Sequence, residues 1–83
     1  MSNRFTECFE EAKDEESAAE CIHCLRKHGE AVMFSQDKGR IILGRESWDK
    51  TVSGEMERLS GLLGINSLEK YKEMDEKYNL TMY

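Results

Sequence analysis

The chain has no proline, no low-complexity stretch and no internal repeat in its 83 residues. It also lacks any apolar run approaching the roughly 18 residues that a membrane-spanning helix needs. The first four residues lead into acidic ones rather than into the apolar segment of a secretory signal. From these absences we expect a single domain, residues 1–83, that is neither exported nor inserted into a membrane.

Catalytic motifs are missing as well. No glycine-rich phosphate loop occurs, and the glycines are explained by helix ends, turns and packing. Neither His23 nor His28 has the neighbouring serine or acid that would mark a nucleophile and its base. We therefore expect no enzymatic activity and no cofactor.

Large aliphatic and aromatic core residues are scarce. Leu, Ile, Val and Phe together make up 16 of the 83 residues, which is near the disorder-prone edge of composition. Their regular spacing and the helix caps nevertheless favour a folded domain. A domain with so little apolar material is expected to gain further burial from a partner or from a second copy of itself.

Apolar spacing of i, i+3, i+4, i+7 predicts a first helix carrying Phe5, Cys8, Phe9 and Ala12. Residues 14–17 interrupt this pattern. A second helix is predicted to begin at Ser17, which forms a capping box with Glu20, and to end at Gly29. Its buried stripe comprises Ala18, Cys21, Ile22 and Leu25. One continuous helix over residues 3–28 is the alternative.

A β-hairpin follows. Residues 31–35 and 40–43 are β-prone runs, and Gly39 lies in the tight turn between them. Both faces of these strands carry apolar residues. Because a lone two-stranded ribbon is marginal in water, helices must cover both faces or a free edge must pair with another chain.

Two more helices complete the pattern. Ser47 is predicted to cap a third helix that ends at Gly64, with Trp48 beside its apolar stripe. That stripe is Val52, Met56, Leu59 and Leu63. Asn66 or Ser67 caps a fourth helix. The order helix, helix, hairpin, helix, helix predicts an α+β fold with four short helices around one antiparallel hairpin.

The cysteines permit a metal site, although no metal is the favoured interpretation. Three cysteines cannot all pair within one chain, and nothing suggests export, so we expect free thiols in a reducing cytoplasm. The one pattern resembling a zinc site consists of Cys8, Cys21, Cys24 and His28. Against it, no second half-site follows, and Cys21 also fits a buried helical stripe. A zinc-dependent domain remains an alternative class.

Charge is the most informative feature. Residues 1–20 hold seven acids and two bases, a balance of −5, whereas residues 21–83 hold ten of each. A one-sided field of this kind steers association with a partner of opposite charge. The candidate contact residues are Glu7, Glu10, Glu11, Asp14, Glu15 and Glu16. Acids at the start of a helix are also favourable in themselves, which is the simpler interpretation of part of this cluster.

We hypothesise a small inhibitor or adaptor whose acidic end engages a basic protein that handles nucleic acid, because lysine and arginine accept carboxylates as well as phosphates. In size and charge the chain is similar to small phage-encoded inhibitors, including anti-CRISPR proteins and DNA mimics. This likeness of type rests on no shared motif.

The alternative function is a small dimeric DNA-binding regulator. Direct nucleic-acid binding is disfavoured because bases and acids balance outside the N-terminal segment. The C-terminal residues Tyr71, Met74, Tyr78 and Met82 are core candidates that could also form a dimer or partner surface.

Overall fold

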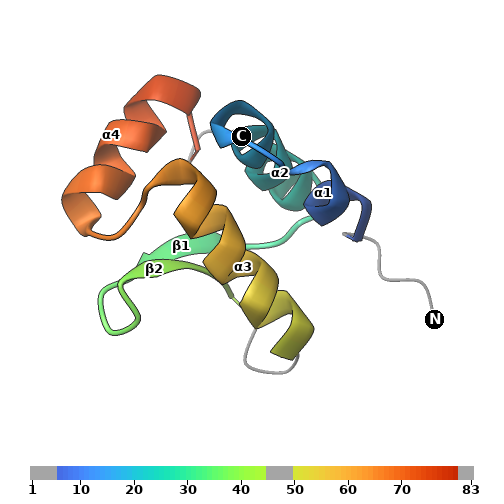
Figure 1. Cartoon of the computed structure of the whole chain (residues 1–83), viewed down its shortest axis with the longest axis horizontal. Helices are drawn as coiled ribbons and strands as arrows, with labels where there is room; N and C mark the ends of the chain where they lie inside the picture. Colours follow the sequence, from blue (N-terminus) through green and yellow to red (C-terminus); the bar gives the residue numbers. More distant parts are fainter. Residues whose placement is uncertain (1–5, 45–49, 81–83) are drawn as a thin grey trace.

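A computed structural model describes residues 6–44 and 50–80. Phe5, Ser47, Trp48 and Met82 lie outside this part of the chain. The described residues form an α+β domain whose order confirms the sequence-based prediction (Figure 1). The elements are α1 (Thr6–Glu11), α2 (Glu15–Lys27), β1 (Val32–Ser35), β2 (Arg40–Leu43), α3 (Lys50–Leu63) and α4 (Leu68–Tyr78).

The first two helices are separate, but α2 begins earlier than predicted. Its N-cap is Asp14, whose carboxylate accepts a hydrogen bond from the Ser17 backbone N–H at 2.8 Å. The Ser17 hydroxyl in turn accepts from the Asp14 backbone N–H at 2.9 Å. The capping box is therefore real but lies three residues upstream, and the prediction that Ser17 and Glu20 form it was wrong. Gly29, with φ of 84°, follows the end of α2 as predicted.

The hairpin is antiparallel, and its turn contains Gly39 at a φ of 66°. One face packs on α3, so Val32, Ile41 and Leu43 are buried. The opposite face carries Met33, which pairs with Ile42 and remains 44% exposed. Among the described residues, helices therefore cover one face of the ribbon and not both.

Side chains occupy the outer edges of the ribbon. Arg26 donates to the Val32 carbonyl at the β1 edge, and the Ile41 N–H donates to the Ser60 hydroxyl at the β2 edge. Edges contacted in this way are less available for pairing with another chain.

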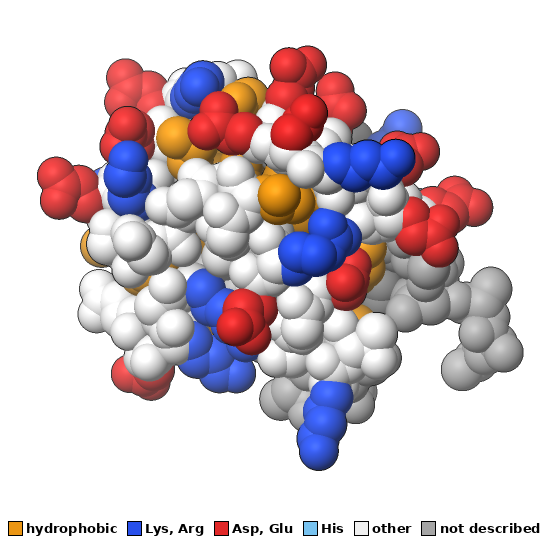
Figure 2. Space-filling model, in the orientation of Figure 1, with side chains coloured by type: hydrophobic (Ala, Val, Ile, Leu, Met, Phe, Trp, Pro, Cys, Tyr) orange, Lys and Arg blue, Asp and Glu red, His pale blue; other side chains and the backbone are white. Residues whose placement is uncertain are grey.

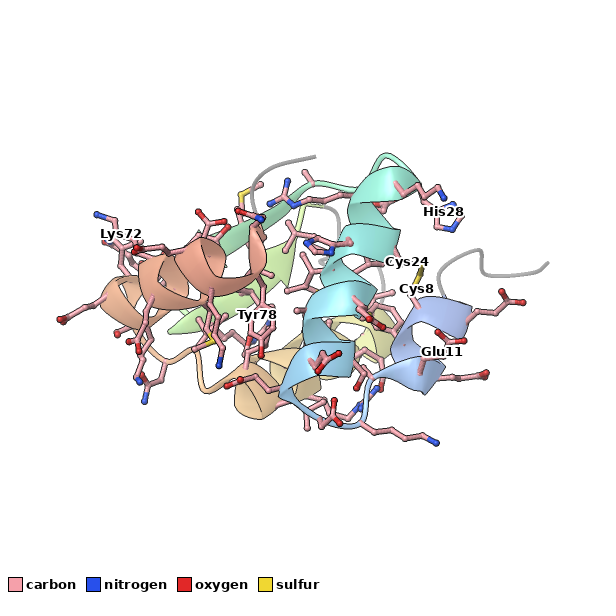
Figure 3. The ribbon with its side chains drawn as sticks, turned by 90° about the horizontal axis from the view of Figure 1, so that it is seen from above. Cys8, Glu11, Cys24, His28, Lys72 and Tyr78 are labelled. Carbon is pink, nitrogen blue, oxygen red and sulfur yellow. A yellow bond between two sulfur atoms is a disulfide. The ribbon has the colours of Figure 1, made fainter. Side chains whose placement is uncertain are left out.

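The core lies where α2, α3 and the hairpin meet. Its largest fully buried side chains are Ile22, Leu25, Ile41, Leu43, Met56, Leu59 and Leu80. The predicted stripe of α3 is buried, and Gly64 ends this helix at a φ of 69°. Ser67, rather than Asn66, caps α4 by accepting from the Lys70 N–H. In Figures 1 and 3, α1 and α4 lie on opposite sides of α2.

Candidate interaction surface

The position of α1 is fixed by two contacts with the rest of the molecule. Cys8 forms a disulfide with Cys24 of α2, and the two Cα atoms lie 5.9 Å apart. From α3, the Arg58 guanidinium donates to the carbonyls of Phe9 and Ala12. These carbonyls lie in the last turn of α1 and just beyond it, where a helix runs short of backbone donors. The Phe9 carbonyl also accepts from the Ala12 backbone N–H at 3.2 Å.

This arrangement leaves a set of carboxylates exposed. The side chains have no hydrogen bond or ion pair with any described residue, and the set comprises Glu7, Glu10, Glu11, Glu16 and Glu20. We call these five residues the acidic face. Figure 2 shows acidic side chains along the upper rim of the molecule, over α4, α2 and α1, with basic side chains between them.

Helical spacing explains why these five side chains project outward. Glu7 lies three and four residues before Glu10 and Glu11 on α1, opposite the buried Cys8 and Phe9. Glu16 and Glu20 are four residues apart on α2, away from its buried stripe. Glu20 is one of the seven N-terminal acids but is not among the six predicted contact residues. It takes no part in the capping box, which Asp14 and Ser17 form.

Two of the six predicted contact residues have structural roles instead. The Ser17 backbone N–H and hydroxyl lower the pKa of the Asp14 carboxyl, as expected for an N-cap. Glu15 accepts hydrogen bonds from the Tyr78 hydroxyl at 2.6 Å and from the Lys77 ammonium at 2.9 Å. These two donors lower the pKa of the Glu15 carboxyl. Glu15 thus ties α2 to the end of α4.

The C-terminal candidates lie mostly inside the molecule. Tyr71 and Met74 belong to the core, with 9% and 7% of their surfaces exposed. Tyr78 is half-buried and directs its hydroxyl to Glu15. At the same end of α4, the His23 ring nitrogen Nε2 lies 2.9 Å from the Tyr78 carbonyl oxygen. Dimerisation through this helix remains a prediction.

The cysteines depart from the sequence-based expectation. Because the packing of α1 on α2 brings Cys8 to Cys24, the prediction that all thiols are free was wrong for this pair. Cys21 is free and buried, and burial raises the pKa of its thiol to about 12. It behaves as a small apolar core residue.

His28 lies beside the disulfide, at the C-cap of α2. One of its ring nitrogens and the two sulfur atoms of Cys8 and Cys24 all lie within 4.8 Å of one another. Figure 3 shows the three side chains at the junction of α1 and the last turn of α2. The structure thus brings together three of the four metal candidates and leaves Cys21 out.

An open hollow of about 700 Å³ lies between the hairpin turn and the α3–α4 turn. Its charged lining residues, Lys38, Arg40 and Glu57, are of both signs. The hollow was not predicted, because the two turns are far apart in the sequence. A mixed lining does not define a ligand.

No protein-family model, curated protein or solved structure matches this chain. Within residues 6–44 and 50–80, none of the helices has both the length and the apolar character needed to cross a bilayer.

Proposed function

We propose that this chain is a non-enzymatic interaction protein, an inhibitor or adaptor, whose acidic face binds a basic surface on a protein that handles nucleic acid. The supporting observation is that five exposed carboxylates on two adjoining helices have no partner among the described residues. Lysine and arginine side chains that normally hold phosphates form charge-assisted hydrogen bonds with carboxylates equally well.

The way α1 is held favours recognition over mere solubility. The disulfide and Arg58 fix this helix against its neighbours, so Glu7, Glu10 and Glu11 are presented in a defined arrangement. Binding through a preorganised surface costs less conformational entropy than binding through a freely moving acidic tail.

Two variants with equal net charge test this proposal. The face variant changes four acids of α1 and α2 to glutamine: Glu7, Glu10, Glu11 and Glu16. The control variant changes four exposed acids on α3 and α4: Glu57, Glu69, Glu73 and Glu76. Each variant has a formal net charge of −1, from −5 + 4. Only the location of the lost charge differs between them.

Wild-type protein is first used to isolate partners from the native host, and the association rate of each purified basic partner is then measured against salt. We expect the face variant to associate about tenfold more slowly at low salt, with a flatter salt dependence, and the control to stay near wild type. Equal behaviour of the two variants would show that overall charge, rather than the acidic face, governs binding and would reject the proposal.

A gel-shift titration against random duplex DNA separates this function from the DNA-binding alternative. The proposal requires that the wild-type chain leave DNA unshifted, because its exposed carboxylates repel phosphates. Retardation of the duplex at physiological salt would replace the inhibitor interpretation with that of a DNA-binding regulator.

A further inference from the structure

The cluster of Cys8, Cys24 and His28 is not used by the acidic face, and it has the composition of a soft-metal site. Thiolate sulfur and imidazole nitrogen are the ligands that zinc prefers in proteins. Cys24 and His28 are four residues apart at the end of α2, a spacing that places both side chains on one side of a helix. Cys8 approaches the same point from α1.

We propose that reduction of the Cys8–Cys24 disulfide creates a zinc site whose protein ligands are the two thiolates and the His28 imidazole. The chain would then exist in two mutually exclusive states, one closed by a sulfur–sulfur bond and one closed by a metal. This proposal concerns residues outside the acidic face and does not depend on the proposed function.

The geometry suits this exchange. Ligand atoms of a tetrahedral zinc lie about 3.5–3.8 Å apart, given Zn–S distances of about 2.3 Å and Zn–N distances of about 2.0 Å. The three candidate ligand atoms already lie within 4.8 Å of one another. Breaking the disulfide frees the Cys8 and Cys24 side chains to rotate, so that their sulfur atoms can separate toward the spacing of zinc ligands.

The cluster is accessible from solvent, unlike a cysteine buried in the core. His28 is exposed and Cys24 is half-buried, so an ion and a reductant can reach the cluster from solvent. Cys21, by contrast, is buried and lies outside the group. Among the described residues no fourth His, Cys, Asp or Glu completes the cluster, which leaves one zinc position for water or an external ligand.

The chemistry balances as two steps. A dithiol reductant transfers two electrons and two protons to the disulfide, which becomes two thiols while the reductant becomes a disulfide. Zinc then binds and displaces the two thiol protons, since the thiolate is the ligand form. A small-molecule disulfide can reverse the first step by taking up two electrons and two protons to become two thiols. This oxidation releases the metal, because each sulfur that enters the protein disulfide is lost as a thiolate ligand.

The test compares one chain in its two redox states. Full-length protein is reduced under anaerobic conditions, freed of reductant, incubated with zinc chloride and examined by native mass spectrometry. We expect one zinc per reduced chain, an added mass of about 63 Da after loss of two protons, and none on the oxidised chain. Cobalt substitution should give a thiolate-to-metal charge-transfer band in the reduced chain alone.

Variants then assign the ligands. His28→Asn should weaken zinc binding about tenfold or more, and the Cys8→Ser/Cys24→Ser double variant should abolish the cobalt band. Cys21→Ala, which removes the thiol outside the cluster, should leave stoichiometry unchanged. Circular dichroism of each variant confirms that it is folded.

Three results would overturn the proposal: no zinc on the reduced chain, equal zinc on the oxidised chain, or unchanged binding in the folded double variant. Because the reduced and oxidised forms share one sequence, the first two results stand even if a variant fails to fold.

Discussion

Helices α1 and α4 lie on opposite sides of α2 and are attached to it by different chemistry. The six-residue α1 is too short to be stable alone and is held by a disulfide and by Arg58. The longer α4 has caps at both ends and is tied to α2 by contacts of Glu15 and His23. The helix with three acidic-face residues is thus attached by a bond that a reductant can break, whereas α4 is attached by hydrogen bonds that include the carboxylate of Glu15.

Breaking the covalent link should have the largest effect. The disulfide joins residues 16 apart, and closing a loop of that size stabilises a fold by about 3 kcal/mol through the unfolded chain. We therefore expect reduction in metal-free buffer to lower the free energy of unfolding by about this amount in urea titrations.

The Cys8→Ser/Cys24→Ser double variant is the matched control, since it has no disulfide to lose. Its stability should be low and insensitive to the reductant. If reduction leaves wild-type stability unchanged, α1 is held by other contacts and the contrast with α4 disappears.

The hydrogen bonds from Arg58 are expected to stabilise the position of α1 less than the disulfide does. Arg58→Met removes the donors to the Phe9 and Ala12 carbonyls but keeps an apolar stem. Charged hydrogen bonds contribute more than neutral ones, but Arg58 is 39% exposed, so we expect a loss of about 1–2 kcal/mol. Hydrogen exchange should increase most in α1.

Glu55→Gln is the control, because it breaks only the surface ion pair with Arg58. It should lower the free energy of unfolding by a few tenths of a kcal/mol, and a loss as large as that of Arg58→Met would contradict the role assigned to Arg58.

Local patterns in the sequence were sufficient to predict the order of the helices and strands. Apolar spacing predicted the buried sides of α2 and α3, and Gly29, Gly39 and Gly64 marked places where the chain adopts a positive φ. The start of α2 was missed because Ser17 satisfies two capping patterns, with Asp14 before it and with Glu20 after it. The extended backbone at Asp14 decides between them.

The candidate site was less predictable because it depends on contacts between distant residues. Exposure of Glu7, Glu10 and Glu11 followed from helical periodicity. The contacts of Glu15 did not, since its partners are 62 and 63 residues further along the chain. The Cys8–Cys24 bond was missed for the same reason. Spacing along α2 indicates that Cys24 and His28 share a side, but only the packing of α1 shows which cysteine joins them.

Alanine substitutions at two glycines near the end of α3 should change the stability of the protein by a smaller amount and in opposite directions. Gly64→Ala places a Cβ at a φ of 69° and should destabilise the protein by about 1 kcal/mol. Gly61→Ala, in the last turns of α3, meets no atom within 4 Å and should stabilise by up to about 1 kcal/mol. Thermal unfolding of both variants measures these two changes in stability. Destabilisation by Gly61→Ala would show that this glycine is needed for close packing.

The smallest expected effect concerns the pH dependence of the α4 attachment, because the side chains of Lys77 and Glu15 are 56% and 40% exposed to solvent. The Tyr78 hydroxyl and Lys77 lower the pKa of Glu15 below its usual 4.5, so this stabilisation is present above that value and is lost as pH falls through the lower folded pKa. Donation to Glu15 raises the pKa of Tyr78 above its usual 10, so stabilisation is present below that value and is lost as pH rises past the folded pKa.

Tyr78→Phe should therefore differ most from wild type between about pH 5 and 9 and should converge with it at both extremes. The urea midpoint measured across pH tests this. The difference between wild type and the Cys8→Ser/Cys24→Ser variant should stay flat over the same range, because neither the disulfide nor serine titrates there. A Tyr78→Phe difference that is equally flat would mean that the Tyr78–Glu15 hydrogen bond does not stabilise the attachment of α4, and the titratable side of the contrast with α1 would be lost.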